Sequence, residues 1–464
     1  MSFRKDFIWG AATASYQIEG AAFEAGKGAS VWDTFSHWDG KILHGDTGDI
    51  ACDHYHRFRD DVKLMAQLGI KNYRFSLSWP RLLPDGTGRV NEEGVAFYNQ
   101  LIDALLENGI RPFVTLFHWD YPQALQDRGA WANPDSPVWF EEYAALCARR
   151  FGDRVKDFIT FNEPQCFIGL GYGTGAHAPG MVLPASMTIP MSHRVLKAHG
   201  LAVRALRTLV PDCRIGYAPC GDVCIPADTN EADIEAARKA YFSVPNSDFW
   251  AFNVAWWSDP ALLGSYPEDG LAHFERFLPR RWENDLPLIH QPLDFYAQNI
   301  YNGRVIRAAD NAQGYEQLPE PVGVPRTAIG WSIHPDALYW GPKFLYERYK
   351  TPFIISENGM SAHDAVSLDG KVHDPNRQDY MHRYLLAYKR AAEDGVDARG
   401  YFAWSLMDNY EWSFGYTERF GLVYVDYATQ KRTPKDSALW YRSIMESNGE
   451  ALQVGSRLPR PQKE

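Results

Sequence analysis

The chain has 464 residues, 45% of them hydrophobic and 23% charged, which is the composition of a folded globular protein. Its formal net charge of −11 repels phosphate groups and argues against nucleic acids and anionic membranes as partners. No apolar stretch approaches the roughly 20 residues that a membrane span needs. The segment Met1–Gly10 lacks the apolar core of a secretory signal, and the six cysteines fit no disulfide or zinc pattern. We therefore expect a cytoplasmic protein with reduced thiols.

Amphipathic helical segments alternate along the chain with short, continuously apolar runs. In the first clear example, Phe58, Val62 and Met65 keep helical spacing before a glycine and an apolar run. The glycines at the ends of such segments are Gly69, Gly109, Gly152 and Gly395. We expect each of them to adopt the positive φ that commonly ends a helix.

Eight apolar runs are candidates for buried strands. They are residues 7–10, 73–76, 111–116, 157–161, 214–217, 294–298, 352–356 and 400–404. Continuous rather than alternating apolar strands are typical of a parallel sheet that is covered on both faces. Eight strand–helix units predict an α/β fold, a (β/α)8 TIM barrel, rather than a doubly wound sheet.

The chain is longer than the about 250 residues that a minimal barrel needs. Most of the surplus follows predicted strands, in residues 11–52, 165–190, 218–260, 302–335 and 405–435. We expect these segments to be long loops at the C-terminal face of the barrel, where barrel active sites lie. No linker or low-complexity tract divides the chain. We therefore predict one catalytic domain over residues 1–464, with a tail that frays from about residue 449.

Two glutamates stand at the ends of predicted strands. Glu163 follows the strand 157–161, and Glu357 follows the strand 352–356. The fourth and seventh strands of a barrel lie on opposite sides of its mouth, so both carboxyl groups would face one pocket. Cleavage of a glycosidic bond needs such a pair, because one group protonates the leaving oxygen and the other meets the positive charge at the anomeric carbon. Either glutamate alone could equally be a structural cap, but their equivalent positions favour catalysis.

Six motifs make the chain resemble glycoside hydrolase family 1, the β-glucosidase family. They are FIWGAATASYQIEG (7–20), YRFSLSWP (73–80), LFHWD (116–120), TFNEP (160–164), ISENG (355–359) and WSLMDNYEW (404–412). The resemblance extends from Phe7 to about Trp440, with the motifs in the order that the family has. It implies a (β/α)8 barrel that needs no cofactor and no metal.

The resemblance implies roles for four residues around the reacting bond. Glu163 would be the acid/base and Glu357 the nucleophile of a retaining mechanism, with carboxyl groups about 5–5.5 Å apart. The charge on Glu357 would raise the pKa of Glu163, so that Glu163 starts protonated near neutral pH. Arg74 would keep the nucleophile ionised, and Tyr301 would orient it.

The resemblance also implies a set of sugar-binding residues. The polar residues that would hold the hydroxyl groups of the nonreducing sugar are Gln17, His118, Asn162 and Glu411. Trp404 would form the platform under the sugar ring, and Trp119 and Trp412 would add donors and walls. Taken singly, each tryptophan is better explained by core packing, and His118 by a satisfied core position.

Specificity is expected to depend on the residues around this set. Glu411 would repel a 6-phosphate, so we expect an unphosphorylated sugar, and Glu163 separates the chain from thioglucosidases, which have glutamine there. Many relatives have tryptophan directly after the Asn-Glu-Pro motif, whereas this chain has Gln165 and then Cys166. We expect both residues in the leaving-group site, opposite the aromatic wall of Trp331. The departure leaves the aglycone preference open.

The sequence thus predicts a retaining, exo-acting β-glucosidase for cello-oligosaccharides and aryl β-glucosides. A broad β-galactosidase/β-fucosidase of the same family and a sugar-binding pseudoenzyme without hydrolytic activity remain as alternatives. Cys52, His54 and His56 resemble a metal cluster, but the two histidines should lie on different faces of a helix. We therefore predict no metal site there. The oligomeric state stays open.

Overall fold

The computed structural model describes residues 2–452, which contain a closed barrel of eight parallel strands in the order β1-β11-β10-β7-β5-β4-β3-β2. The barrel strands are β1 (Ile8–Ala12), β2 (Asn72–Ser76), β3 (Arg111–Phe117), β4 (Asp157–Asn162), β5 (Arg214–Ala218), β7 (Phe295–Asn299), β10 (Phe353–Asn358) and β11 (Ala398–Trp404). Each predicted run overlaps one of these strands, with ends that differ by one or two residues. The predicted (β/α)8 fold is confirmed.

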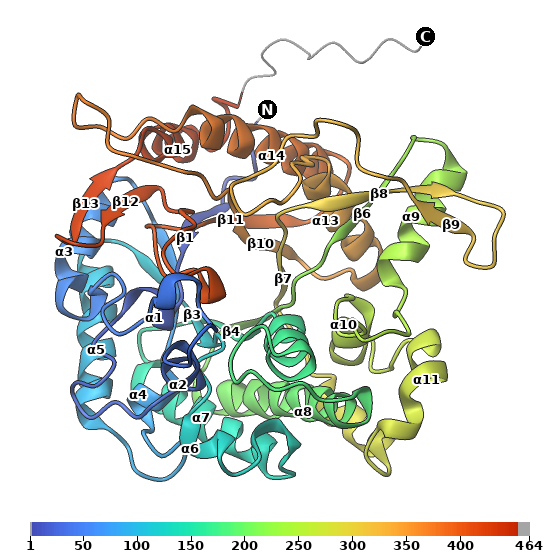
Figure 1. Ribbon diagram of the computed structural model, residues 1–464, viewed down its shortest axis with the longest axis horizontal. Helices are drawn as coiled ribbons and strands as arrows, with labels where there is room; N and C mark the ends of the chain where they lie inside the picture. The colour runs from blue at the N-terminus through green and yellow to red at the C-terminus, as the bar shows by residue number, and fades with distance from the viewer. Residues whose placement is uncertain (1, 453–464) are drawn as a thin grey trace.

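Helices surround the strands (Figure 1). The longer ones are α3 (His54–Gln67), α5 (Glu92–Glu107), α7 (Ser136–Phe151), α8 (Ala185–Leu209), α9 (Glu231–Phe242), α13 (Ala337–Tyr349), α14 (Pro375–Glu393) and α15 (Asp436–Glu446). The shorter ones are α1 (Ser15–Ile18), α2 (Val31–Ser36), α4 (Trp79–Leu82), α6 (Gln123–Gln126), α10 (Ala255–Leu262), α11 (Glu268–Phe274), α12 (Leu286–Ile289), the 3₁₀ turns η1 (Leu43–Gly45), η2 (Ala130–Ala132), η4 (Glu275–Phe277), η5 (Trp282–Asp285) and η6 (Trp412–Phe414), and the π-helical segment η3 (Gln165–Thr174). Within residues 2–452, no helix combines the length and the apolar character that crossing a membrane requires.

Helix α5 shows how the sequence pattern forms these units. Val95, Tyr98, Ile102 and Leu105 are spaced three or four residues apart and are all buried. Gly109 then adopts φ 69°, and the amide of the next residue donates to the carbonyl of Leu105, which closes the helix before β3 begins.

The expected positive φ is confirmed at Gly69, Gly109 and Gly395 but is wrong at Gly152, whose φ is −68°. A Cβ atom at Gly152 would lie 2.3 Å from Cγ2 of Val210. Glycine is therefore required there by close packing against the end of α8 and not by backbone conformation.

The barrel strands are buried on both faces, which explains their continuous apolar runs. Inside the barrel, Phe113 packs edge-on against Phe402 with ring centroids 5.0 Å apart, while the neighbouring Val114 belongs to the core between strands and helices. A Cβ atom at Gly10 would lie 2.5 Å from the ring of Phe402. The barrel therefore has an apolar, filled interior at this level, and its cavity lies further along the axis.

The segments predicted as loops do follow the strands, but they contain more regular structure than expected. Strands β6 (Val223–Pro226), β8 (Gly303–Ala308) and β9 (Tyr315–Gln317) form a three-stranded sheet. Strands β12 (Val423–Asp426) and β13 (Lys431–Pro434) form an antiparallel pair on the opposite side of the molecule in Figure 1. Strand β6 pairs with β8, which is distant in sequence, so local pattern did not reveal this pairing.

Of the tail predicted to fray, residues 449–452 are described, and Leu452 among them is buried. The amide of Gly449 donates to the carbonyl of Ile444, which continues the end of α15. Residues 453–464 lie outside the described residues.

A buried ionic network fastens the long segment after β11. Lys435 is fully buried, and its Nζ lies 2.6 Å from carboxylate oxygens of both Asp364 and Asp408. Arg377 also pairs with Asp364, and Arg419 pairs with Asp408. Because each buried charge has an opposite partner, removal of one member leaves another uncompensated.

We predict that Lys435→Met lowers the free energy of unfolding by about 3–5 kcal/mol, because two buried carboxylates lose their shared cation. Chemical denaturation monitored by tryptophan fluorescence measures the change. The matched control is Arg442→Met, which breaks the exposed pair with Glu446 and should cost no more than about 1 kcal/mol. Equal losses in the two variants would contradict a special contribution of the buried network.

Candidate active site

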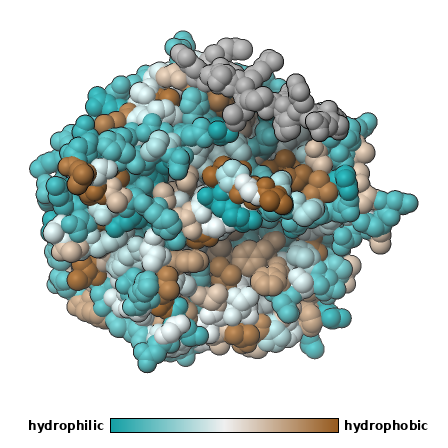
Figure 2. Space-filling model, turned by 45° about the horizontal axis from the view of Figure 1, so that its top comes forward, coloured by the Kyte–Doolittle hydropathy of each residue, from teal (hydrophilic) through white to brown (hydrophobic). Residues whose placement is uncertain are grey.

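A cavity of about 380 Å³ opens at the C-terminal ends of the barrel strands, a size suited to a small-molecule ligand. The surface in Figure 2 is mostly hydrophilic, with a recess bordered by more apolar residues. The predicted site residues that line the cavity are His118, Trp119, Glu163, Gln165, Cys166, Tyr301, Trp331, Glu357, Trp404, Glu411 and Trp412. The other three predicted residues, Gln17, Arg74 and Asn162, are buried beside them and contact them.

Glu163 directly follows β4, and Glu357 lies near the end of β10. Glu163 is only 8% exposed and Glu357 only 3%, yet both side chains line the cavity. Glu163 has φ 46°, a left-handed conformation that is unusual for a residue with a side chain. Trp119 and Trp412 also have positive φ, at 80° and 50°. Each such position carries backbone strain of about 1–3 kcal/mol, and these three residues line the cavity.

Two strong donors bind the carboxylate of Glu357. Nη1 of Arg74 donates to Oε1 at 2.7 Å, and the hydroxyl of Tyr301 donates to Oε2 at 2.7 Å. Arg74 is itself buried and also donates to the carbonyl of Ser356 and to Oδ1 of Asn162. A fixed cation and a hydroxyl group thus favour the ionised form of Glu357.

The contacts of Glu163 are weaker donors. Nδ2 of Asn299 donates to Oε1 at 2.7 Å, and the thiol of Cys166 donates to Oε2 at 3.1 Å. Asn299 also donates to Oδ1 of Asn162, and its own Oδ1 accepts from Ser356. Sequence reasoning missed Asn299, although it stands two residues before Tyr301 at the end of β7.

Burial raises the pKa values of both carboxyl groups. For Glu357, burial raises the pKa while the charge of Arg74 and the hydroxyl of Tyr301 oppose the shift and the charge of Glu163 adds to it. For Glu163, burial raises the pKa while donation from Asn299 and Cys166 and the charge of Arg74 oppose the shift. Two interacting carboxyl groups in this environment can retain one proton between them near neutral pH.

The predicted sugar-binding residues form two hydrogen-bonded groups, one around Asn162 and one between Gln17 and Glu411. Nδ2 of Asn162 lies 3.0 Å from Nε2 of His118, and the indole of Trp119 donates to the carbonyl of Asn162 at 3.0 Å. Burial, together with the charge of Arg74, holds the pKa of His118 well below its usual range, so the imidazole is neutral. Nε2 of Gln17 donates to Oε2 of Glu411 at 3.4 Å.

Aromatic rings form the walls of the cavity. The rings of His118 and Trp404 are nearly parallel with centroids 5.8 Å apart, and Trp119 and Trp412 lie 4.4 Å apart. On another part of the lining, the ring of Trp331 packs against that of Tyr301 with centroids 5.1 Å apart. Apolar faces of this kind can pack against the C–H faces of a sugar, while the polar groups bind its hydroxyls.

Glu411 differs in one respect from what the sequence suggests. Burial raises its pKa to about 8, and the charges of Glu357, Glu418 and Glu163 raise it as well. The carboxyl group of Glu411 is therefore harder to ionise than an exposed one.

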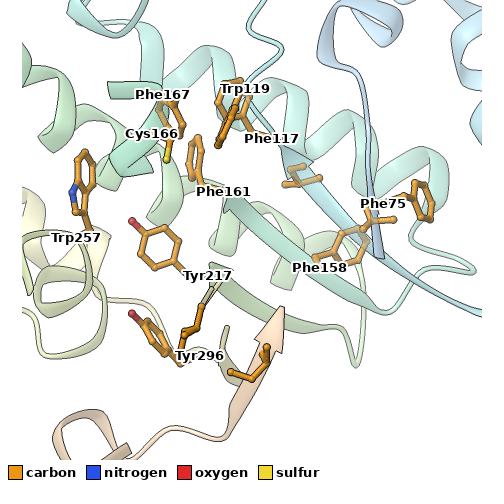
Figure 3. Packing of buried hydrophobic residues seen from close by; sticks show 14 of the residues in the cluster. Phe75, Phe117, Trp119, Phe158, Phe161, Cys166, Phe167, Tyr217, Trp257 and Tyr296 are labelled. Carbon is orange, nitrogen blue, oxygen red and sulfur yellow. The ribbon is translucent and has the colours of Figure 1, made fainter. Parts of the chain in front are cut away.

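Gln165 lines the cavity, but its side-chain amide is hydrogen-bonded to backbone groups. Nε2 donates to the carbonyls of Cys220 and Asn253 at 2.8 and 3.1 Å, and Oε1 accepts from the amide of Cys220. Cys166 follows on η3, whose Phe167 packs against the rings of Phe117 and Phe161 (Figure 3). Gln165 therefore fastens the neighbouring loops that contain Cys220 and Asn253.

The sequence also missed apolar residues that the long loops bring to the cavity. They are Leu170, Phe252, Ile329, Phe414 and Phe420. Loop residues of this type carry no local pattern, because only the path of the folded chain turns them toward the pocket.

His54 and His56 lie on different faces of α3, as predicted. His54 is buried with its Nδ1 2.8 Å from Asp61, whereas His56 is exposed and contacts Asp53. A different group, Glu163, Cys166 and Cys220, brings possible ligand atoms within 4.8 Å of one another.

Comparison with known proteins agrees with this geometry. A model of the family described as glycosyl hydrolase family 1 matches residues 1–450. The chain belongs to glycosyl hydrolase family 1. It is therefore an enzyme that hydrolyses glycosidic bonds, as the sequence motifs predicted.

Members of the family with assigned names are similar over almost their whole length. "Beta-glucosidase A" of Thermotoga maritima is 45% identical over 449 residues, which cover 96% of this chain and 98% of that protein. The "bifunctional beta-D-glucosidase/beta-D-fucosidase" of Bifidobacterium breve is 41% identical over 469 residues, covering 96% and 98%. The structure of the Thermotoga maritima β-glucosidase in complex with glucoimidazole matches with a TM-score of 0.89 and 44% identity, covering 97% and 99%.

The raised pKa of Glu411 leads to a prediction about stability. A carboxyl group whose pKa is raised on folding costs no stability at pH values below its unfolded pKa, and the cost grows as pH rises toward the folded pKa of about 8. Glu411→Gln should therefore raise the melting temperature relative to the original protein more at pH 8 than at pH 5. Differential scanning calorimetry at both pH values measures this, with the exposed Glu446→Gln as control. A pH-independent difference for Glu411→Gln would contradict the shift.

Proposed function

We propose that the protein is a retaining, exo-acting β-glucosidase for unphosphorylated substrates such as cello-oligosaccharides and aryl β-glucosides. The observation that carries the proposal is the pair of buried glutamates, Glu163 and Glu357, which line one cavity. Glu357 accepts a hydrogen bond from a guanidinium, whereas Glu163 accepts one from an amide. Relatives named β-glucosidase that are 43–45% identical over nearly the whole chain support the choice of sugar. The proposed unit is a single catalytic domain, and the family match over residues 1–450 supports it.

The different hydrogen-bond donors to the two carboxylates support a division of roles between the two glutamates. The guanidinium of Arg74 and the hydroxyl of Tyr301 stabilise a negative charge on Glu357, so Glu357 is the nucleophile. Glu163 has only amide and thiol donors and retains the shared proton, so Glu163 is the general acid. No cofactor or metal takes part in this chemistry.

The reaction then has two steps. Glu357 attacks the anomeric carbon while Glu163 donates its proton to the leaving oxygen, and a covalent glycosyl-enzyme forms. Esterification removes the negative charge of Glu357, and the pKa of Glu163 falls. Glu163 then accepts a proton from water, which attacks the anomeric carbon from the side that the aglycone left. Two inversions at this carbon give net retention.

Binding of the glucosyl unit would use the hydrogen-bonded group around Asn162 together with the pair of Gln17 and Glu411. Asn162 would bind the 2-hydroxyl, where a hydrogen bond strengthens in the transition state. Gln17, His118 and Glu411 would bind further hydroxyls, with Trp404 as the platform and Trp119 and Trp412 as walls. Among the described residues, Oε1 of Gln17 and Nδ1 of His118 are buried polar atoms without a hydrogen-bond partner in the chain, which supports a polar ligand beside them.

A side activity on β-fucosides is a second proposal, and the printed name of the Bifidobacterium breve relative supports it. Comparison of turnover on p-nitrophenyl β-glucoside, β-galactoside and β-fucoside tests it. A non-hydrolytic sugar-binding protein is not favoured, because both carboxyl groups and their donors are present. The six cysteines have free thiols, which supports the proposal of a reducing, cytoplasmic location.

We predict that Glu357→Ala abolishes hydrolysis of 2,4-dinitrophenyl β-glucoside and that added azide restores turnover with an α-configured glucosyl azide as product. Azide then occupies the face from which Glu357 attacks, so one inversion takes place. NMR of the product reads its anomeric configuration.

Glu163→Ala is the matched variant. It should lower kcat/KM for poorly activated substrates by about 10²–10⁴-fold, because these substrates need a proton donor. Azide should here attack the glycosyl-enzyme and give the β-configured azide. If both variants form the same anomer, or if the two anomers are exchanged between them, the assigned roles are wrong.

The contact of Asn299 with Glu163 leads to a separate prediction. Donation from Asn299 lowers the pKa of Glu163, so Asn299→Ala should raise it. The alkaline limb of the pH profile of kcat/KM, which reports the general acid of the free enzyme, should therefore move to higher pH. Ser356→Ala, which removes a donor to Asn299 but leaves the amide next to Glu163, should shift the limb less. A limb that moves to lower pH in Asn299→Ala would count against Glu163 as the acid.

A further inference from the structure

Two cysteine thiols lie beside the proposed acid/base in the wall of the cavity. The thiol of Cys166 donates to Oε2 of Glu163 at 3.1 Å, and Sγ of Cys166 lies 3.9 Å from Sγ of Cys220. The three side chains offer ligand atoms that all lie within 4.8 Å of one another. All three residues line the cavity, so a small solute can reach them from the same side as the substrate.

The backbone of Cys220 is held in place from two sides. Gln165 forms a pair of hydrogen bonds with it, one to its carbonyl at 2.8 Å and one from its amide at 3.3 Å. Cys220 also forms a parallel β-bridge with Asn299 at the end of β7. Cys166 lies on η3, three residues after Glu163. The folded chain therefore holds the thiols and the carboxylate together before any ligand binds.

The sulfur–sulfur separation matches metal coordination better than a disulfide. Tetrahedral zinc with Zn–S bonds of about 2.3 Å places two thiolate sulfurs about 3.8 Å apart, close to the 3.9 Å between Cys166 and Cys220. A disulfide would need the sulfurs to approach to about 2.05 Å. A carboxylate oxygen is an accepted third ligand for zinc. Thiolate-rich sites select soft cations such as Zn²⁺ and Cd²⁺ over Mg²⁺ or Ca²⁺.

We propose that Glu163, Cys166 and Cys220 form a binding site for a thiophilic divalent cation, Zn²⁺ or Cd²⁺, and that the bound cation inhibits the enzyme. Binding displaces the two thiol protons and the proton that Glu163 holds, all of which pass to solvent, and forms two metal–sulfur bonds and one metal–oxygen bond without any oxidation. The fourth position faces the cavity and takes a water molecule.

Inhibition follows from the ligand that the cation shares with catalysis. A carboxylate bound to a cation cannot hold the proton for the leaving oxygen, and the cation also occupies space on the aglycone side of the cavity. This part of the inference rests on the proposed role of Glu163, whereas cation binding itself does not. The two parts are therefore tested separately.

Cation binding is measured by titrating the reduced, metal-free enzyme with Cd²⁺ and following the ultraviolet charge-transfer band of cadmium thiolates. We expect one Cd²⁺ per chain. Cys166→Ala and Cys220→Ala should each weaken binding at least about tenfold, as should Glu163→Gln, which removes an anionic ligand but no sulfur. Cys213→Ala is the matched control, because Cys213 is a buried thiol that is not part of the cavity lining, and it should bind Cd²⁺ like the original protein.

Absence of the charge-transfer band in the original protein, or original affinity in Cys220→Ala, would overturn the proposed site. Full thiol counts before titration exclude a disulfide as the reason for weak binding. A disulfide found between Cys166 and Cys220 in the reduced preparation would also overturn the proposal.

Inhibition is measured as the loss of p-nitrophenyl β-glucoside hydrolysis with increasing Zn²⁺, each variant being compared with its own rate in EDTA. The original protein should lose activity over the concentration range in which Zn²⁺ displaces bound Cd²⁺, and EDTA should restore it. Cys220→Ala should need at least about tenfold more Zn²⁺ for the same fractional loss. Recovery by dithiothreitol but not by EDTA would reject metal inhibition in favour of thiol oxidation. Saturated binding with an unchanged rate would reject the inhibitory part, and the azide products described above would then decide whether the role of Glu163 is wrong as well.

Discussion

The buried guanidinium of Arg74 is the interaction on which the mouth of the barrel depends. From β2 it donates to Thr115 on β3, to Asn162 on β4, and to Ser356 and Glu357 on β10. One cation thus joins four strands across the barrel. A buried charge is tolerated only when it is paired and hydrogen-bonded. The interior therefore changes along the axis from apolar packing around Phe113 to a polar network around Arg74.

The polar network around Arg74 also explains why the two glutamates differ in their tendency to ionise although both are buried in one cavity. Burial raises the pKa values of both carboxyl groups, so a pair of free charges is unfavourable. The position of Arg74 beside only one of them breaks the symmetry. Arg74 touches Asn162, and Asn162 touches Asn299, which donates to Glu163. The contacts of the two carboxyl groups are thus linked through amide groups on β4 and β7.

The walls of the cavity depend on a different constraint, which is how the long segments after the strands are held. The segment after β11 is fastened by the buried pairs of Lys435 with Asp364 and Asp408. The segment after β5 is fastened by the amide of Gln165. Positive φ values at Trp119, Glu163 and Trp412 show that the surrounding packing outweighs local backbone preference there.

The sequence by itself determined the eight strands and the glutamates at the ends of two of them, because continuous apolar runs, helical periodicity and family motifs are local signals. It did not reveal the hydrogen bond from Asn299 to Glu163, the hydrogen bonds between Gln165 and Cys220, or the raised pKa of Glu411. Only the tertiary structure decided these, since hydrogen bonding and burial depend on residues that are distant along the chain. Gly152 shows the same limit on a small scale. Its place at a helix end was visible in the sequence, but the reason for glycine was the side chain of Val210, 58 positions further on.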